Sequence, residues 1–210
     1  MSKISLNIDG RELEAHQGAS VLETALAHGI YIPHLCHDPE LKPHGGCRLC
    51  LVAVRGAKGF PAACTTQIAD GMVVVTAGEE LERVRRDVLE LLLTEHPMDC
   101  LSCAKNQHCA LQKAAAHIGG VARTLRRTQV AGRGVELTPC FNLDRDYCIL
   151  CQKCVRACDE IAHKRLLVVA NRGATSQITT FMSVEQMTAT CENCRECLKR
   201  CPTAALRPLP

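Results

Sequence analysis

Sixteen cysteines in a chain of 210 residues are the part of this sequence that can carry chemistry. Cysteine at this density indicates either a disulfide framework or metal ligation. The start of the chain has neither the apolar segment nor the cleavage site of a secretory signal, and no stretch approaches the roughly 20 apolar residues of a membrane span. We therefore expect a cytoplasmic chain without a transmembrane segment, in which reduced thiols bind metal.

One four-cysteine run occurs twice near the C-terminus with the same spacing, as Cys148-x2-Cys151-x2-Cys154-x3-Cys158 and Cys191-x2-Cys194-x2-Cys197-x3-Cys201. The spacing is typical of bacterial two-cluster ferredoxins, in which the first three cysteines bind one [4Fe–4S] cluster and the fourth binds the other. Zinc sites more often use paired C-x2-C knuckles on separate loops, which disfavours zinc here. The predicted ligand sets are Cys148, Cys151, Cys154 and Cys201 for one cluster, and Cys158, Cys191, Cys194 and Cys197 for the other.

A second kind of group lies in the N-terminal part, Cys36-x10-Cys47-x2-Cys50-x13-Cys64. Four thiolates around a C-x2-C core indicate a [2Fe–2S] cluster, although plant-type proteins have a shorter first gap. Gly45-Gly46 would let the backbone approach the cluster closely. A zinc site remains the alternative.

The last group has only three cysteines, His96-x3-Cys100-x2-Cys103-x5-Cys109. A [4Fe–4S] cluster needs a fourth ligand, for which we predict His96, with His108 as the rival. By spacing alone, a zinc site of three cysteines and one histidine fits nearly as well. Fifteen cysteines and His96 would then serve one [2Fe–2S] and three [4Fe–4S] clusters. Cys140 is left over, and we expect it to be a small buried hydrophobe.

Several periodic stretches must position these groups. Strands are predicted at 4–8 and 13–15 around a turn at Asp9-Gly10, and a capping box at Ser20 and Glu23 predicts a short helix that Gly29 ends. Further strands are expected at 51–54 and 72–75, and a hairpin at 166–170 and 177–181. Apolar residues at steps of three and four predict a helix over 79–95, and a second helical stretch is expected at about 107–117.

These elements predict an α+β protein of three modules. We expect a β-grasp [2Fe–2S] ferredoxin-like domain over 1–78, a small helical domain with the His-ligated [4Fe–4S] cluster over 79–118, a connector over 119–139, and a bacterial-type 2[4Fe–4S] ferredoxin domain over 140–210. Aromatic residues make up only 2% of the chain, so something other than bulky side chains must organise its core. The net charge of +3 is too balanced to indicate nucleic-acid binding.

The order of a [2Fe–2S] group, a group with one histidine and three cysteines, and a doubled C-x2-C-x2-C-x3-C run resembles one family of electron-transfer proteins. It is similar to the N-terminal region of the large iron–sulfur subunit of NADH-quinone oxidoreductase, to the accessory region of [FeFe]-hydrogenases, and to the iron–sulfur subunits of NAD-linked hydrogenases and formate dehydrogenases. The resemblance covers nearly the whole chain. Within it, Glu95-His96-Pro97-x2-Cys100-x2-Cys103 marks the His-ligated cluster.

The resemblance implies an electron-relay subunit of a soluble NAD(P)-linked oxidoreductase complex. Its partners would be a flavin-containing, NAD(P)H-oxidising iron–sulfur subunit and a separate catalytic subunit, either a hydrogenase or a molybdenum or tungsten formate dehydrogenase. The sequence has no G-x-G-x-x-G fingerprint and no P-loop, and it ends nine residues after Cys201, so we expect no active site in this chain. A free polyferredoxin carrier, a zinc-rich scaffold and a fragment of a longer enzyme are the alternatives.

Overall fold

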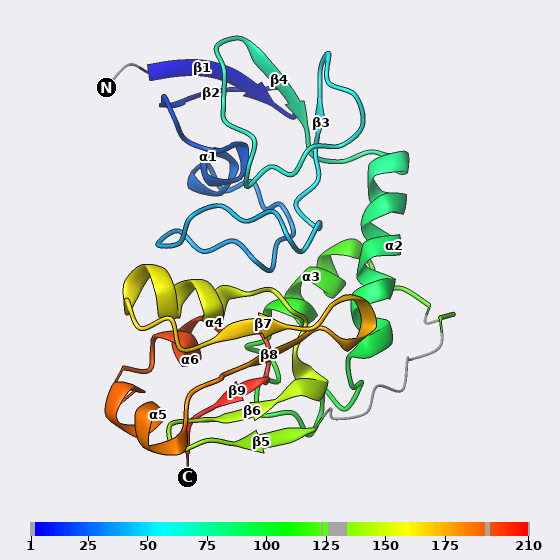
Figure 1. The fold of residues 1–210 in the computed structure, drawn as a ribbon. Helices are drawn as coiled ribbons and strands as arrows, with labels where there is room; N and C mark the ends of the chain where they lie inside the picture. The colour runs from blue at the N-terminus through cyan, green and yellow to red at the C-terminus, as the bar shows by residue number, and fades with distance from the viewer. Residues whose placement is uncertain (1–2, 123, 126–133, 192–193, 210) are drawn as a thin grey trace. The chain divides into compact units, whose positions relative to one another are not determined.

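The computed structural model describes residues 3–122, 124–125, 134–191 and 194–209. The chain divides into two compact units (Figure 1). The first unit comprises Met1–Pro39, Pro43–Leu89 and Ala114–Val121. The second unit comprises Glu40–Lys42, Glu90–Lys113 and Ala122–Pro210.

The first unit contains a four-stranded mixed sheet in the order β2-β1-β4-β3. Its strands are β1 (Lys3–Ile8), β2 (Arg11–His16), β3 (Ala53–Val54) and β4 (Met72–Val75). β1 pairs antiparallel with β2 and parallel with β4, while β3 pairs antiparallel with β4. The predicted strands at 4–8 and 72–75 are confirmed, whereas the strand expected at 51–54 is shorter, because Leu51 makes only an isolated bridge to Ala62.

The predicted hairpin turn joins β1 to β2. Asp9 and Gly10 both have positive φ, +51° and +81°, as a two-residue turn between twisted strands requires. The turn is completed by Asn7, whose Oδ1 accepts a hydrogen bond of 2.9 Å from the Gly10 amide. This turn sets the register in which Leu6 faces Leu13.

Helix α1 (Val21–Ala27) carries the predicted capping box. The Ser20 hydroxyl accepts from the Glu23 amide at 3.2 Å, and the Glu23 carboxylate accepts from the Ser20 amide at 2.9 Å. Gly29, at φ +75°, ends the helix as predicted. The buried face of α1 packs in one apolar cluster with the sheet and with two cysteines, Leu6, Ile8, Val21, Leu22, Val74, Cys50 and Cys64 among its members.

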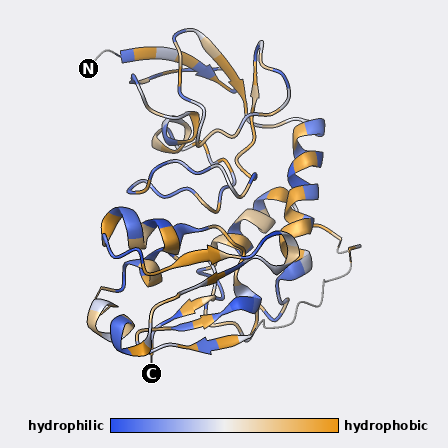
Figure 2. Cartoon of the chain, in the orientation of Figure 1, coloured by the Kyte–Doolittle hydropathy of each residue, from blue (hydrophilic) through white to orange (hydrophobic). Residues whose placement is uncertain are grey.

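Helix α2 (Glu79–Glu95) has the predicted bounds. Hydrophobic and hydrophilic residues alternate along it in Figure 2, as an amphipathic helix requires. Acidic Glu79, Glu80 and Glu82 occupy its first turn, where they suit the helix dipole. Helix α3 (Ala110–Ile118) begins later than the expected residue 107, because Gln107 adopts a left-handed φ of +65° inside the preceding cysteine loop.

The second unit has a three-stranded sheet, β5-β6-β9, and a separate hairpin, β7-β8. These elements are β5 (Val135–Leu137), β6 (Asn142–Asp144), β7 (Val168–Ala170), β8 (Gln177–Thr179) and β9 (Leu206–Arg207), with short helical segments at Arg145–Tyr147, α4 (Lys153–Arg156), Ala157–Ile161, Gly173–Thr175, α5 (Val184–Cys191) and α6 (Glu196–Arg200). The expected hairpin is confirmed with shorter strands. Around Phe141, Leu143, Leu166 and Ile178, the core also contains cysteine side chains.

The predicted connector over 119–139 contains a regular element at its C-terminal end. Val135–Leu137 forms β5, which pairs antiparallel with β6. The glycines of this segment end at Gly134. The residues that follow it pair with the strand at 142–144. The basic residues Arg123, Arg126, Arg127 and Arg133 lie outside the described residues.

The capping box at α1 yields a first prediction. Ser20→Ala removes the acceptor for the Glu23 amide and should lower the free energy of unfolding by about 1 kcal/mol. Urea unfolding of the anaerobic protein, followed by circular dichroism, should show a lower midpoint with the same slope. Ser5→Ala, at an exposed position of β1, is the matched control; an equal loss in both variants would contradict the capping assignment.

Candidate metal centres

The four N-terminal cysteines predicted to bind one cluster lie together in the first unit. Cys36, Cys50 and Cys64 are buried and Cys47 is half-buried. Hydrogen bonding with Cys36, followed by burial, raises the pKa of the Cys47 thiol. The hydrogen bond with Cys36 lowers the pKa of the Cys64 thiol, but the hydrogen bond with Cys50 and burial outweigh it and raise that pKa to about 11. The structure therefore brings the four predicted ligands close enough together for their thiols to interact.

The backbone around this group is held from the core. Ala63 donates its amide to the carbonyl of Cys50 at 2.7 Å, which ties two ligand-bearing loops together. Gly45 and Arg48, on either side of Cys47, have φ of +69° and +54°. A non-glycine residue in this region costs about 1–3 kcal/mol and persists where surrounding structure enforces it. The amide of Cys47 donates to Cys36 Sγ at 3.4 Å, so backbone polarity is directed at a ligand sulfur.

The group with three cysteines lies in the second unit. Burial is the main cause that raises the pKa of Cys109, and the negative charges of Cys103 and Cys100 add to it. The two candidate histidines differ: His96 is 7% exposed, whereas His108 is exposed on the surface. A buried imidazole at the end of α2 suits a ligand better than an exposed one.

Tyr147 connects His96 with the cysteines. Its ring meets the His96 ring edge-on, with centroids 5.5 Å apart at 85°. Its hydroxyl donates to the Asp99 carboxylate, a hydrogen bond that raises the Tyr147 pKa to about 12, with a smaller contribution from the charge of Cys103. His96 and Cys103 therefore flank the same tyrosine.

The tandem runs exchange their last cysteines in space. The groups that act electrostatically on Cys197 are Cys191, Cys158 and Cys194. Those acting on Cys151 include Cys201 and Cys148. Cys158, the last cysteine of the first run, thus lies near Cys197 of the second, and Cys201, the last of the second run, lies near Cys151 of the first. Burial is the main cause that raises the pKa of both Cys151 and Cys197 to about 12, so these thiols need a metal to take the place of their protons.

The two copies of the run share an unusual backbone feature. Gln152 follows the second cysteine of the first run with φ +59°, and Arg195 follows the second cysteine of the second run with φ +51°. Helices α4 and α6 begin at the next residue in each copy. Left-handed turns of this kind direct successive amides to one side, where they can face an anionic group. The repeat in sequence is therefore a repeat in backbone conformation.

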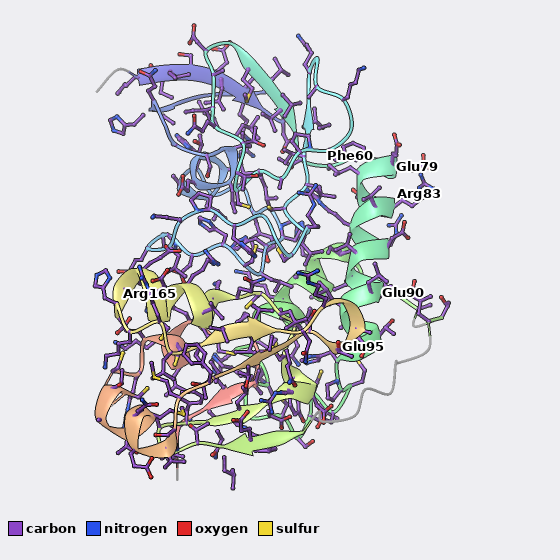
Figure 3. All side chains as sticks on the ribbon, in the orientation of Figure 1. Phe60, Glu79, Arg83, Glu90, Glu95 and Arg165 are labelled. Carbon is purple, nitrogen blue, oxygen red and sulfur yellow. The ribbon has the colours of Figure 1, made fainter. Side chains whose placement is uncertain are left out.

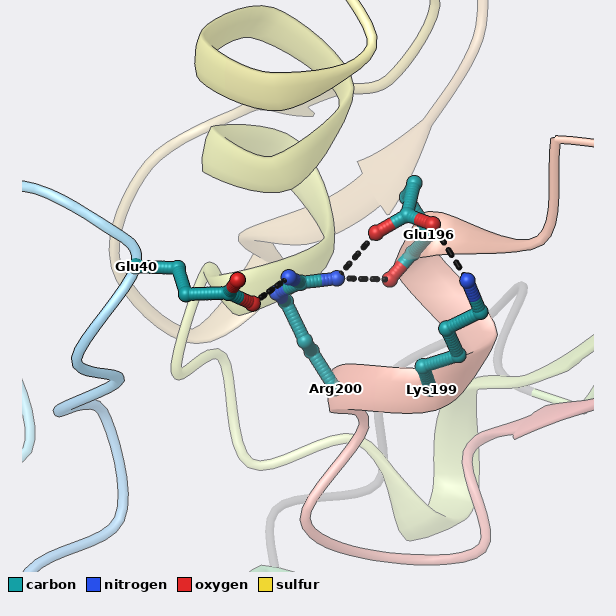
Figure 4. A network of polar contacts seen from close by, with 4 residues as sticks. All are labelled: Glu40, Glu196, Lys199 and Arg200. Atoms are coloured by element: carbon teal, nitrogen blue, oxygen red, sulfur yellow. Dashed lines mark hydrogen bonds and ion pairs between the residues drawn. The ribbon is translucent and has the colours of Figure 1, made fainter.

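Helix α6, which carries Cys197, is fixed by a charged network (Figure 4). Arg200 pairs with Glu196 on the preceding turn and with Glu40, and Lys199 lies 2.5 Å from Glu196. The Arg200 side chain is only 9% exposed, so these pairs compensate a charge largely removed from water. Glu40 belongs to the short segment Glu40–Lys42 of the second unit.

One hydrogen bond joins the group with three cysteines to the Cys201 loop, and a second joins that loop to Tyr147. The Ala110 amide, next to Cys109, donates to the Pro202 carbonyl at 3.0 Å. The Thr203 hydroxyl donates to the Tyr147 carbonyl at 2.7 Å. Tyr147 and Thr203 were missed in the sequence, although Tyr147 directly precedes the first cysteine of a run and is one of only two tyrosines.

Cys140, His34 and His37 lie close to the cysteine groups but are not predicted ligands. Cys140 is half-buried rather than fully buried, and its thiol donates to the Met187 carbonyl at 3.4 Å. It also hydrogen-bonds with Cys191, whose pKa is raised mainly by burial. His34 and His37, beside Cys36, contact each other with ring centroids 5.6 Å apart.

The arrangement of the thiols bears on which metal they would hold. Within the described ranges, no three His, Cys, Asp or Glu side chains converge on a position that could hold a single metal ion. Iron–sulfur clusters distribute their thiolates over several irons, whereas zinc gathers four ligands around one centre. The sulfur atoms appear in yellow among the side chains of Figure 3.

Three family models match consecutive stretches of the chain. Residues 1–79 match a 2Fe-2S iron-sulfur cluster binding domain. Residues 85–120 match the NADH-ubiquinone oxidoreductase-G iron-sulfur binding region. Residues 141–205 match a 4Fe-4S dicluster domain. Both kinds of cluster-binding domain expected from the cysteine spacing are therefore confirmed.

Whole-chain relatives agree with these matches. A G-type subunit (number 2) of NADH-quinone oxidoreductase from Rhizobium meliloti (strain 1021) is 36% identical over 99% of this chain, which spans 24% of that protein. The NADP-reducing hydrogenase subunit HndD of Solidesulfovibrio fructosivorans is 33% identical over 98% of this chain, which spans 36% of its length. The chain therefore spans a quarter to about a third of these relatives.

One solved structure matches nearly end to end. A chain in the crystal structure of an NAD+-reducing [NiFe]-hydrogenase in the H2-reduced state is 34% identical, with a TM-score of 0.86. The match covers 99% of this chain and 88% of that one. No helix in the described part of the present chain is long and apolar enough to cross a membrane.

The hydrogen bond to the Tyr147 carbonyl yields a second prediction. Thr203 is 1% exposed, and Thr203→Val keeps its shape but removes the donor, which should cost about 1 kcal/mol of stability. We expect a lower urea midpoint and faster release of iron to a chelator. Thr188→Val, which changes an exposed threonine of α5, should leave both unchanged; equal behaviour of the two variants would contradict a role for this bond.

Proposed function

Because this chain belongs to the family of iron–sulfur subunits that includes the G-type subunits of NADH-quinone oxidoreductase and NAD(P)-reducing hydrogenase subunits, we propose that it is an electron-relay subunit. Electrons would pass between a flavin-containing, NAD(P)H-oxidising subunit and a separate catalytic subunit. The proposal rests on fifteen buried or half-buried cysteines that lie in four groups. The last cysteine of each tandem run lies near cysteines of the other run.

The proposed ligand sets follow the sequence prediction. One [2Fe–2S] cluster would be held in a β-grasp module over 1–78, and one His-ligated [4Fe–4S] cluster in the module over 79–118. Two [4Fe–4S] clusters would occupy the ferredoxin module over 140–210, after the connector over 119–139. The ligands, in the same order, are Cys36, Cys47, Cys50 and Cys64; His96, Cys100, Cys103 and Cys109; Cys148, Cys151, Cys154 and Cys201; and Cys158, Cys191, Cys194 and Cys197.

The clusters supply one-electron carriers, and the protein's residues set how easily each accepts its electron. Backbone amides donate to the sulfurs of proposed ligands, among them Cys47 to Cys36 at 3.4 Å and Leu166 to Cys158 at 3.2 Å. Such bonds stabilise the added negative charge and raise the reduction potential. His96 would replace a thiolate by a neutral ring, which favours reduction for the same reason.

Partners and location follow from the same family membership. The names of the relatives point to a hydrogenase or a quinone-linked oxidoreductase as the destination of the electrons. A molybdenum or tungsten formate dehydrogenase is the other catalytic partner that the resemblance implies. We propose a cytoplasmic location, because a reducing compartment would keep the cysteines available as cluster ligands.

The choice between the two histidines yields a third prediction. His96→Ala should lose one [4Fe–4S] cluster, or about four irons, because the cubane would keep only three protein ligands. His108→Ala, at the exposed position directly before Cys109, should keep all of its iron. Iron and sulfide analysis of anaerobically purified protein gives the readout. Loss of a cluster in the His108 variant alone would reverse the assignment.

A fourth prediction concerns electron entry. The relay should be reduced by dithionite and reoxidised by a one-electron acceptor, but NADH or NADPH alone should leave its visible absorption unchanged, because its sequence has no dinucleotide-binding fingerprint. Anaerobic stopped-flow absorbance measures both reactions. Reduction of the clusters by NADH without a partner subunit would show that the chain oxidises nucleotide itself and is not a relay.

A further inference from the structure

One arginine of α2 is buried where its neighbours are not. Arg85 is 4% exposed, whereas Arg83 and Arg86 on the same helix are exposed (Figure 3 labels Arg83). Arg85 stands four residues from both Leu81 and Leu89, in the apolar stripe of the helix. A fully charged side chain in this stripe is expensive to bury unless another charge compensates it.

The hydrogen-bond partners of Arg85 are neutral. Its Nη2 donates to the Leu51 carbonyl at 2.5 Å and its Nη1 to the Thr76 carbonyl at 2.8 Å. Its Nε is buried without a partner, and no ion pair to Arg85 occurs among the described residues. Two carbonyl oxygens do not neutralise a guanidinium, and no carboxylate among the described residues forms an ion pair with it.

Three negatively charged groups act on the guanidinium of Arg85. Burial lowers the pKa of Arg85, and the first of the negative charges that oppose this shift is Cys50, ahead of Glu82 and Asp9. The Asp9 carboxylate is already engaged by the amide and hydroxyl of Thr76 at 2.7 and 2.5 Å. Leu51, which receives the Arg85 bond, directly follows Cys50 in the chain. The guanidinium therefore lies against the loop that carries a proposed cluster ligand.

We propose that Arg85 is the buried counter-cation of the [2Fe–2S] cluster, and that it raises the reduction potential of this cluster while positioning the Cys50 loop. This inference rests on the proposed ligand set of Cys36, Cys47, Cys50 and Cys64. On reduction, one electron enters the cluster and one iron passes from ferric to ferrous, with no bond broken and no proton moved. The cluster becomes more negative by one charge, which the nearby guanidinium stabilises. Arg85 is thus a positioning and tuning residue, not a ligand.

The test is an anaerobic potentiometric titration of the full chain, in which electron paramagnetic resonance follows the [2Fe–2S] signal. Arg85→Gln should lower the equilibrium constant for reduction at least tenfold, a shift of about 59 mV to more negative potential. Arg85→Lys keeps the charge and should stay nearer to the wild type than Arg85→Gln. Arg83→Gln, on the exposed face of α2, is the matched control and should leave the potential unchanged. A purely structural role would lower stability in Arg85→Gln without moving the potential.

A measurement without a variant of Arg85 covers the case in which Arg85→Gln does not fold. The chain is labelled with 15N in the guanidinium nitrogens of arginine, in an Arg48→Lys background that removes the exposed arginine between Cys47 and Cys50. Electron–nuclear double resonance of the reduced cluster should then show coupling to guanidinium nitrogen. A full [2Fe–2S] signal without this coupling, or an unchanged potential in a folded Arg85→Gln variant, overturns the inference and leaves the relay proposal intact. Absence of the [2Fe–2S] signal from the wild-type chain would overturn the ligand set and the inference together.

Discussion

The need to hold cysteine thiols in groups is the constraint on which the rest of this structure depends. The chain has few aromatic residues, and in both units cysteine side chains are members of the apolar core. Cys50 and Cys64 pack with Leu22 and Val74, and Cys154 and Cys158 pack with Leu166. Because burial raises the pKa of several of these thiols, a metal that binds them must displace tightly held protons.

The backbone meets this constraint by accepting local strain. Residues in the left-handed region stand between or directly after ligand cysteines, as Arg48, Gln152 and Arg195 do. Around these turns the loops are tied by buried contacts such as the Thr203 hydroxyl on the Tyr147 carbonyl. Polar and charged groups also lie near these cysteines: backbone amides donate to the sulfurs of Cys36 and Cys158, and the buried Arg85 donates to the carbonyl of Leu51, next to Cys50.

Much of this could be predicted from the sequence, because spacing and periodicity are local properties. The bounds of α2 and the capping box at Ser20 follow from steps of three or four residues. What could not be predicted depends on distant partners. Strand β5 exists because 142–144 accepts it, and Tyr147 matters because His96 and Thr203 approach it from other loops. The sequence does place the charged Arg85 within the apolar stripe of a helix. Its partner, the loop that follows Cys50, could be identified only from the structure.

The most direct test of the central claim, that these groups hold four clusters, is Mössbauer spectroscopy of the full chain enriched in 57Fe under anaerobic conditions, with parallel analysis of sulfide and zinc. One [2Fe–2S] and three [4Fe–4S] clusters predict about fourteen irons and as many sulfides per chain, with about one seventh of the spectral area from the [2Fe–2S] cluster. Stoichiometric zinc in place of iron, or a spectrum without a [2Fe–2S] component, would contradict the account.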